Sequence, residues 1–175
     1  MPNYKRMYAQ NHPVFITINT YKRRSILINN FKLLQESWKI AKEKFKFNIF
    51  AYCVLPDHIH LILEMNDIYE YPKIIGSMKW HFSKNINTKF VERKSLSISK
   101  QKKREKGIWQ RRYYEHTIRD DKELAIYTDY IHYNPVKHGW VKSVQDWKNS
   151  SFYDFVKEDI YDIEWGSEIK IPYKE

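Results

Sequence analysis

The stretch VLPDHIHLILEM, residues 54–65, decides the fold prediction because a turn signal inside it divides two apolar runs. Pro56-Asp57 is typical of a tight turn, so the flanking runs are predicted to form an antiparallel hairpin. Side chains alternate between the two faces of a strand, and His58 and His60 therefore share one face. The opposite face is apolar and is predicted to be buried against helices (Ile59, Leu61 and Leu63).

The two histidines allow more than one interpretation from spacing alone. Their imidazoles project together from the start of a central strand, which suits two ligands of one metal ion. Two hydrogen-bonded strand histidines without a metal would give the same pattern. Cys53, on the neighbouring strand, could add a zinc ligand, but the sequence has no clustered Cys and His spacing of the kind found in structural zinc sites.

Hydrophobic periodicity on either side of this hairpin predicts the remaining elements. The strands are expected over residues 14–20, 47–55 and 58–65, an extended segment over 107–118, and helices over 30–45, 71–90 and 121–133. Asp120 and Glu123 resemble a capping box at the start of the last helix. The pair Asn134-Pro135 predicts its end, because a residue before proline is pushed out of the helical region.

The order strand, helix, strand, strand, helix, strand predicts an α+β fold of the ferredoxin-like, split βαβ type. Its antiparallel central sheet would carry two helices on one face and the C-terminal helix on the other side. We expect residues 1–175 to form one domain, with a core over about 10–155 and a tail, 156–175, that wraps the core. Residues 92–106 are basic and lack periodicity, which predicts an exposed, mobile loop.

Composition narrows the class of protein. Lys and Arg number 31 against 21 Asp and Glu, and the resulting net charge of +10 favours a polyanionic partner such as nucleic acid. A single cysteine excludes an intrachain disulfide. We see no signal peptide and no apolar run long enough to span a membrane, so the sequence predicts a soluble cytoplasmic protein.

The segment LAIYTDYIHYNP, residues 124–135, offers a candidate nucleophile. On a helix, Tyr127 shares a stripe with Leu124 and Ile131, which is typical of core packing. Tyr130 instead has the amide of Asn134 one turn below it, so Tyr130 is the better catalytic candidate. Spacing alone equally allows Tyr130 to be a packed ring and Asn134 a helix cap.

Together, PDHIHLIL and DYIHYNPVKHGWV resemble the IS200-type single-tyrosine transposases, and in particular the REP-associated tyrosine transposase branch of the HUH endonuclease superfamily. The resemblance implies that His58, His60 and Asn134 hold a divalent metal ion, Mg²⁺ or Mn²⁺. It also implies that Tyr130 attacks single-stranded DNA and forms a 5′-phosphotyrosine. Members of this branch recognise hairpins in palindromic repeats, so hairpin DNA is the expected partner.

The basic and aromatic residues of two segments are predicted to contact DNA, because arginine and lysine pair with phosphates and aromatic rings stack on unpaired bases. These residues are Lys22, Arg23, Arg24, Trp109, Arg111, Arg112 and Tyr114. Two alternatives stay open: a non-catalytic binder of single-stranded nucleic acid and a replication-initiator-type HUH nuclease. The expected oligomeric state is a monomer or a homodimer.

Overall fold

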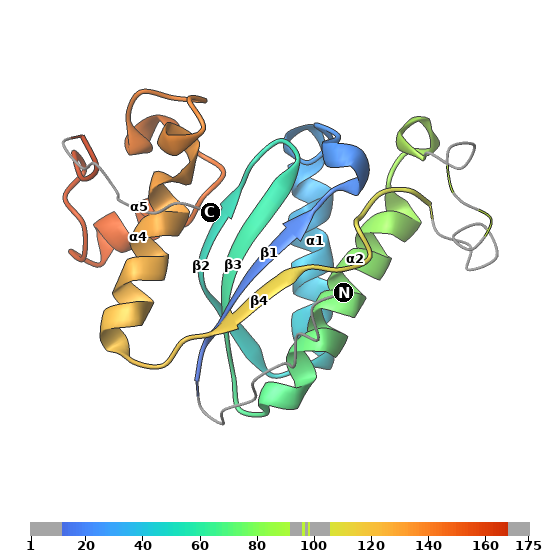
Figure 1. Cartoon of the computed structure of the whole chain (residues 1–175), viewed down its shortest axis with the longest axis horizontal. Coiled ribbons are helices and arrows are strands. Elements are labelled where there is room, and N and C mark those ends of the chain that lie inside the picture. The colour runs from blue at the N-terminus through green and yellow to red at the C-terminus, as the bar shows by residue number, and fades with distance from the viewer. Residues whose placement is uncertain (1–11, 92–95, 97, 99–105, 168–175) are drawn as a thin grey trace.

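A four-stranded antiparallel sheet forms the centre of the computed structural model, which describes residues 12–91, 96, 98 and 106–167 (Figure 1). The strands are β1 (Val14–Asn19), β2 (Phe47–Val54), β3 (His58–Met65) and β4 (Tyr114–Thr117). Their order is β2-β3-β1-β4, and all pairs are antiparallel. This order confirms the predicted ferredoxin-like arrangement.

Two helices, α1 (Phe31–Lys44) and α2 (Tyr71–Asn85), cover one face of this sheet (Figure 1). Their apolar stripes are buried there, and Ile59, Leu61 and Leu63 of β3 face the same layer. This layer is the larger of the two apolar clusters, and its fully buried members include Leu34, Ala41, Ile59, Leu61, Leu63, Ile74 and Phe82. Its burial leaves His58 and His60 on the other face.

The opposite face of the sheet packs against α4 (Asp121–Lys137), with α5 (Phe152–Lys157) beyond it. A smaller apolar cluster joins β1, β2 and β3 to these helices. Tyr161 and Trp165 extend the cluster into the predicted tail, where their rings stack at a centroid distance of 4.3 Å. The described part of the tail therefore packs against α5, and residues 168–175 lie outside the described residues.

The predicted end of the last helix is wrong. α4 continues through Pro135 to Lys137, although a proline inside a helix removes one backbone hydrogen bond. The helix is stopped instead by Gly139, two residues after Lys137, whose φ of 70° supplies the left-handed conformation. The amides of Gly139 and Trp140 donate to the carbonyls of Val136 (2.9 Å) and Pro135 (2.9 Å), which is a Schellman motif.

Two other boundaries differ from the prediction. α2 ends at Asn85, and Thr88–Phe90 forms a separate 3-10 turn because the Asn87 side chain accepts the Lys89 amide and competes with the helix. The extended segment over 107–118 contributes only four residues to β4, and before them Trp109 forms a single bridge with Thr20. The predicted mobile loop, 92–106, lies largely outside the described residues. None of the described helices is long and apolar enough to cross a membrane.

Candidate active site

An open cavity of about 640 Å³ lies between the sheet and α4. The sheet contributes side chains from β1 and β3, and the helix contributes the face that carries both candidate tyrosines. The lining residues that matter for chemistry are Arg23, His58, His60, Tyr127 and Tyr130. The fold therefore brings the histidine pair and the predicted nucleophile to one cavity, although some seventy residues separate them in the sequence.

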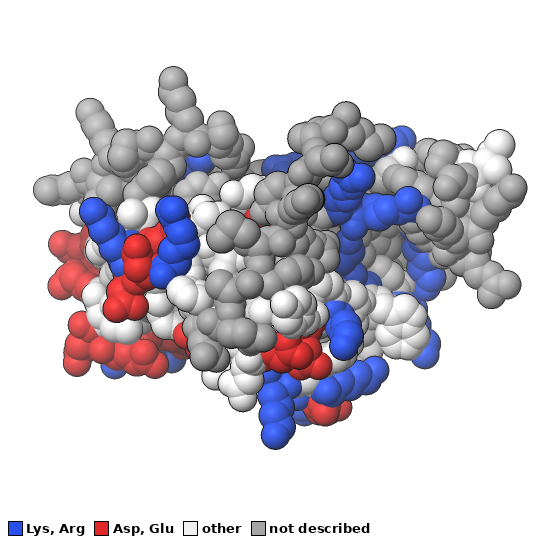
Figure 2. All heavy atoms as spheres, turned by 60° about the horizontal axis from the view of Figure 1, so that its bottom comes forward, with Lys and Arg blue, Asp and Glu red and all other residues white. Residues whose placement is uncertain are grey.

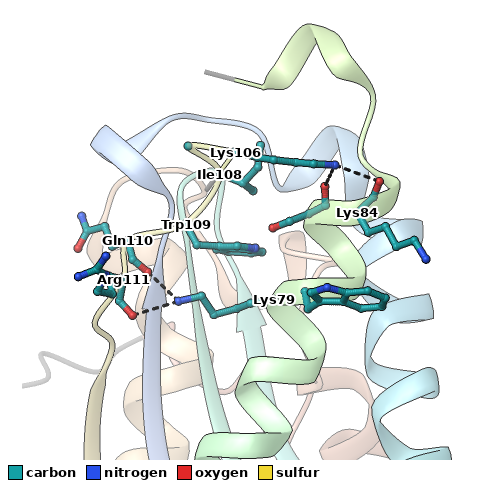
Figure 3. A pocket seen from close by; sticks show the side chains of 10 residues that line it. Lys79, Lys84, Lys106, Ile108, Trp109, Gln110 and Arg111 are labelled. Atoms are coloured by element: carbon teal, nitrogen blue, oxygen red, sulfur yellow. Dashed lines mark hydrogen bonds between the residues drawn. The ribbon is translucent and has the colours of Figure 1, made fainter. Parts of the chain in front are cut away.

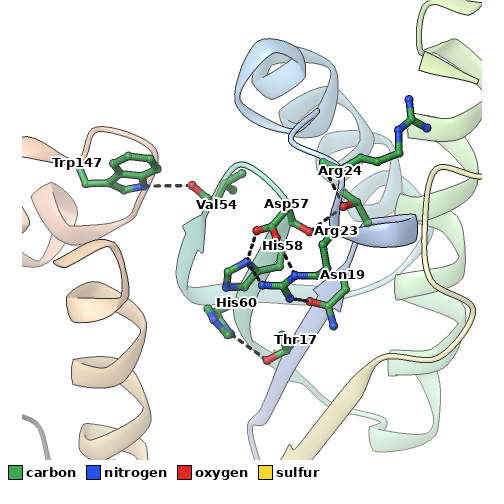
Figure 4. Close-up of polar contacts among 10 residues, drawn as sticks. Thr17, Asn19, Arg23, Arg24, Val54, Asp57, His58, His60 and Trp147 are labelled. Carbon is green, nitrogen blue, oxygen red and sulfur yellow. Dashed lines mark hydrogen bonds and ion pairs between the residues drawn. The ribbon is translucent and has the colours of Figure 1, made fainter. Parts of the chain in front are cut away.

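His58 is oriented by a chain of polar contacts at the start of β3 (Figure 4). Its Nδ1 lies 2.7 Å from Oδ1 of Asp57, and the other carboxylate oxygen lies 2.7 Å from Nε of Arg23. A guanidinium nitrogen of Arg23 also donates to Asn19, the residue that pairs with His58 across the β1–β3 ladder. Because a carboxylate only accepts, Nδ1 of His58 carries the proton and Nε2 keeps its lone pair.

His60 has the equivalent arrangement one pleat further along β3. Its Nδ1 lies 2.9 Å from Oγ1 of Thr17, which is its partner in the β1–β3 register (Figure 4). Its Nε2 is buried and has no hydrogen-bond partner among the described residues. The two imidazole rings lie 4.9 Å apart, so both rings face the same small volume.

Burial controls the charge of the pair. Desolvation lowers the pKa of His58, although the hydrogen bond to Asp57 opposes this effect. Desolvation lowers the pKa of His60 well below its usual value, and the neighbouring His58, His138 and Lys137 add to that shift. Both imidazoles are therefore neutral near pH 7, which is the form that binds a metal ion.

The helix α4 presents Tyr130 and Asn134 to this pair. The ring of Tyr130 lies 5.3 Å from the ring of His60, in an edge-to-face arrangement. Asn134 is fully buried and lies close enough to His60 to raise the pKa of that imidazole, although neither polar atom of the amide reaches hydrogen-bond geometry with a described residue. The extra helical turn through Pro135 keeps Asn134 one turn below Tyr130.

These residues fit a divalent metal ion. Unpartnered buried polar atoms are rare, and three of them are found here: Nε2 of His60 and both polar atoms of the Asn134 amide. No group of three His, Cys, Asp or Glu side chains converges in the described ranges, so a third protein ligand would be an amide oxygen rather than a carboxylate. Cys53 does not suit the role, because burial raises the pKa of its thiol and keeps it protonated.

The second tyrosine, Tyr127, lies in a different environment. Its ring packs 4.5 Å from Phe15 and stacks 5.1 Å from His116. Burial raises the pKa of Tyr127, and its hydrogen bond to Tyr114 adds to the effect. A phenol with a raised pKa is a poorer nucleophile at neutral pH, so this environment disfavours Tyr127 as the nucleophile.

Sequence reasoning missed several residues that surround the site. Asp57 was interpreted only as a turn residue and Thr17 only as a strand residue, yet both orient a histidine. Nζ of Lys137 lies 4.8 Å from the ring centre of Tyr130. Lys137 follows Tyr130 by seven residues, so helical spacing could have identified it. The exposed His138 places its ring 5.3 Å from that of His58.

The predicted DNA-contact residues divide into two groups. Arg23 lines the cavity, and the exposed members lie beside the sheet edge (Lys22, Arg111, Arg112 and Tyr114). Arg24 instead donates to the carbonyls of Phe90 (2.8 Å) and Gly107 (3.2 Å), which ties two chain segments together. Trp109 is buried, and its ring packs 5.0 Å from that of Phe82.

Comparison with known proteins assigns the chain to a family. The family described as "Transposase IS200 like" matches residues 7–134, so the chain belongs to the IS200-like transposase family. Its similarity within that family is to the REP-associated tyrosine transposases. A REP-associated tyrosine transposase of Escherichia coli strain K12 is 35% identical over 173 residues, which are 97% of this chain and 93% of the relative.

A Haemophilus influenzae protein that is assigned to the same group is 41% identical over 168 residues, covering 95% of this chain and 94% of that protein. The solved structure of a REP-associated tyrosine transposase bound to a REP hairpin superimposes with a TM-score of 0.76. The match covers 94% of this chain and 91% of that one, at 32% identity. The fold and the family assignment therefore agree over most of the chain.

Proposed function

We propose that this transposase cuts and rejoins single-stranded DNA at hairpin-forming repeats, with Tyr130 as the nucleophile. The observation that carries the proposal is the meeting of β3 and α4 at one cavity. There the ring of Tyr130 lies 5.3 Å from that of His60, and Asn134, one helical turn below Tyr130, is close enough to His60 to influence the pKa of that imidazole. Hairpin DNA is the proposed substrate because a structural relative is described as bound to a REP hairpin.

The reaction is a transesterification. The Tyr130 oxygen attacks the scissile phosphorus, the bond from phosphorus to the 3′ oxygen breaks, and the phenol proton passes to solvent. The products are a 5′-phosphotyrosine and a DNA 3′-OH, which takes up a proton. Attack by a 3′-OH on the phosphotyrosine reverses these bond changes and joins new ends.

The side chains of the cavity have separate parts in this reaction. His58, His60 and Asn134 would hold Mg²⁺ or Mn²⁺, which supplies polarisation of the phosphate and offsets its negative charge. We expect Mn²⁺ to support the reaction at least as well as Mg²⁺, because Mg²⁺ prefers a shell made of oxygen ligands. The ammonium of Lys137, 4.8 Å from the ring of Tyr130, favours the ionised form of the phenol.

The test is a covalent-adduct assay with hairpin DNA labelled at either end and Mn²⁺. Wild-type protein should form an adduct that survives denaturing electrophoresis and retains the label on the 3′ side of the cut. Tyr130→Phe should abolish the adduct, whereas the matched Tyr127→Phe variant should retain it. An adduct that persists in Tyr130→Phe and disappears in Tyr127→Phe would refute the assignment. Tight hairpin binding with no adduct would support a non-catalytic binding protein instead.

A further inference from the structure

A second cleft of about 400 Å³ lies on the other side of the sheet edge, between α2 and residues 106–111 (Figure 3). Its walls contain two indole rings, those of Trp80 and Trp109. The other side chains at its rim are mostly basic (Lys79, Lys84, Lys106 and Arg111). Among the described residues that line it, none is acidic, so the cleft suits an anionic ligand.

Two lysines hold the segment 106–111 against α2. Nζ of Lys106 donates to the carbonyls of Ser83 (2.8 Å) and Lys84 (3.3 Å), near the end of α2. Nζ of Lys79 donates to the carbonyls of Gln110 (2.7 Å) and Arg111 (3.4 Å), as Figure 3 shows. These bonds build the cleft and keep two ammonium charges in its wall. They use two of the three N–H groups of Lys106.

Trp80 and Trp109 provide the two features that an unpaired base needs. The side chain of Trp80 is 56% exposed, an unusual exposure for so large an apolar ring. Trp109 is 8% exposed, and its buried Nε1–H has no acceptor among the described residues. The first offers a stacking surface, and the second, packed 5.0 Å from the ring of Phe82, forms the inner apolar wall of the cleft.

Charge favours nucleic acid as the ligand. Nζ of Lys84 lies 4.8 Å and Nζ of Lys44 lies 5.9 Å from the ring centre of Trp80, so cations surround the exposed ring. Figure 2 shows that Lys and Arg gather on the side of α2, whereas Asp and Glu gather on the side of α4 and α5. The acidic side chains there include Asp154, Glu158, Asp159 and Asp162. A polyanion is thus directed toward the face that carries Trp80.

The cleft is also connected to the active site. Arg111 lines the cleft, and Tyr114, three residues later, lines the cavity that contains His58. Three residues of extended chain span about 10 Å. Since β4 is the edge strand, a DNA strand can cross the edge from one site to the other without passing through the protein.

We propose that this cleft binds one unpaired nucleotide of the DNA substrate, with its base stacked on Trp80 and its phosphate near Lys84 and Lys106. The proposal rests on the proposed DNA function and adds a second contact point remote from Tyr130. Duplex DNA cannot fill the cleft in this way, because the faces of its bases are already stacked. Trp80 would therefore distinguish a hairpin with a single-stranded flank from the same hairpin without one.

The test is a fluorescence-anisotropy titration of the full-length protein in EDTA, which prevents metal-dependent cleavage. The probes are a labelled DNA hairpin with a single-stranded flank and the same hairpin with the flank removed. Trp80→Ala should weaken binding of the flanked hairpin by about 5- to 150-fold, the effect of losing one base–aromatic stack. It should leave the affinity for the trimmed hairpin unchanged, and Trp80→Phe should restore most of the loss.

The matched control is Tyr153→Ala, which removes an exposed aromatic ring on α5, on the acidic side. It should bind both probes as the wild type does. Equal affinity of Trp80→Ala and wild type for the flanked hairpin would overturn the cleft assignment alone. Failure of the wild type to bind either hairpin would count against the proposed DNA function itself. A flank that carries 2-aminopurine should lose fluorescence on binding to wild type and not on binding to Trp80→Ala.

Discussion

The contact between Asp57 and His58 gives the sharpest prediction about the metal site. Asp57→Ala removes the carboxylate that lies 2.7 Å from Nδ1 of His58. It leaves the turn intact, because Asp57 accepts the amide and hydroxyl of Thr20 through its backbone carbonyl. Loss of such a supporting carboxylate weakens metal binding by about 10- to 100-fold. This range corresponds to about 1.4–2.7 kcal/mol.

Arg23 makes the effect larger than the loss of one hydrogen bond. Its Nη2 lies 3.3 Å from Nδ1 of His58, and it becomes the only remaining partner when Asp57 is removed. A guanidinium only donates, so it would force the imidazole proton onto Nε2, where the metal ion has to bind. We therefore expect Asp57→Ala to weaken Mn²⁺ binding by about 100-fold, the larger end of that range. The double variant with Arg23→Ala should regain part of the affinity.

Isothermal titration with Mn²⁺ as the probe measures this directly, and circular dichroism checks that each variant is folded. Asp57→Asn should fall between wild type and Asp57→Ala, because its amide oxygen still accepts from Nδ1. Asp159→Asn is the control for net charge, since Asp159 is exposed and its φ of 55° is tolerated by asparagine. Wild-type Mn²⁺ affinity in a folded Asp57→Ala variant would refute the proposed orientation of His58.

Three further outcomes test the surrounding residues. Thr17→Val removes the 2.9 Å hydrogen-bond partner of the buried Nδ1 of His60. It should therefore lower the free energy of unfolding by about 1–3 kcal/mol, measured by chemical denaturation. It should also weaken Mn²⁺ binding, measured by titration. Lys137→Met should move the pH–rate profile of adduct formation to higher pH, because the cation near Tyr130 is gone; an unchanged profile would exclude that role. Burial lowers the pKa of His132 to about 3, so below pH 6.5 the unfolded chain binds a proton that the folded chain does not. Stability is therefore lost as pH falls from 6.5, by about 2 kcal/mol at pH 5 from this residue. His132→Phe should reduce that loss in denaturation curves at pH 7 and pH 5, and an equal loss in both proteins would contradict the assignment.

Local patterns in the sequence predicted most of the fold because the residues in question act locally. The alternation in HIHLILEM set the strand and its two faces, and Asp120 begins α4 as predicted by accepting the amide of Glu123. Local patterns did not predict where α4 ends. Pro135 is a strong local stop signal, and the tertiary packing of α4 against the sheet together with the Gly139 cap overrides it.

Spacing in the sequence predicted the parts of the candidate site, whereas its assembly was expected only from the resemblance to the transposase family. The alternation of His58 and His60 and the spacing of Tyr130 and Asn134 follow from the repeats of a strand and a helix. Which histidine nitrogen is presented to a metal ion depends on Asp57 and Thr17, and these contacts exist only once β1 pairs with β3. The sequence shows no periodic signal for such pairing partners, because they are distant in the chain.

The sequence by itself determined the element order, the faces of each strand and helix, and which side chains are candidates for the reaction. Tertiary structure alone decided that β3 and α4 meet at one cavity, that Lys137 lies over Tyr130, and that a second cleft opens beside Trp80. The physical reason is that the backbone repeat fixes where a side chain points. Burial and hydrogen-bond partners, which set its charge and chemistry, come from residues that folding brings together.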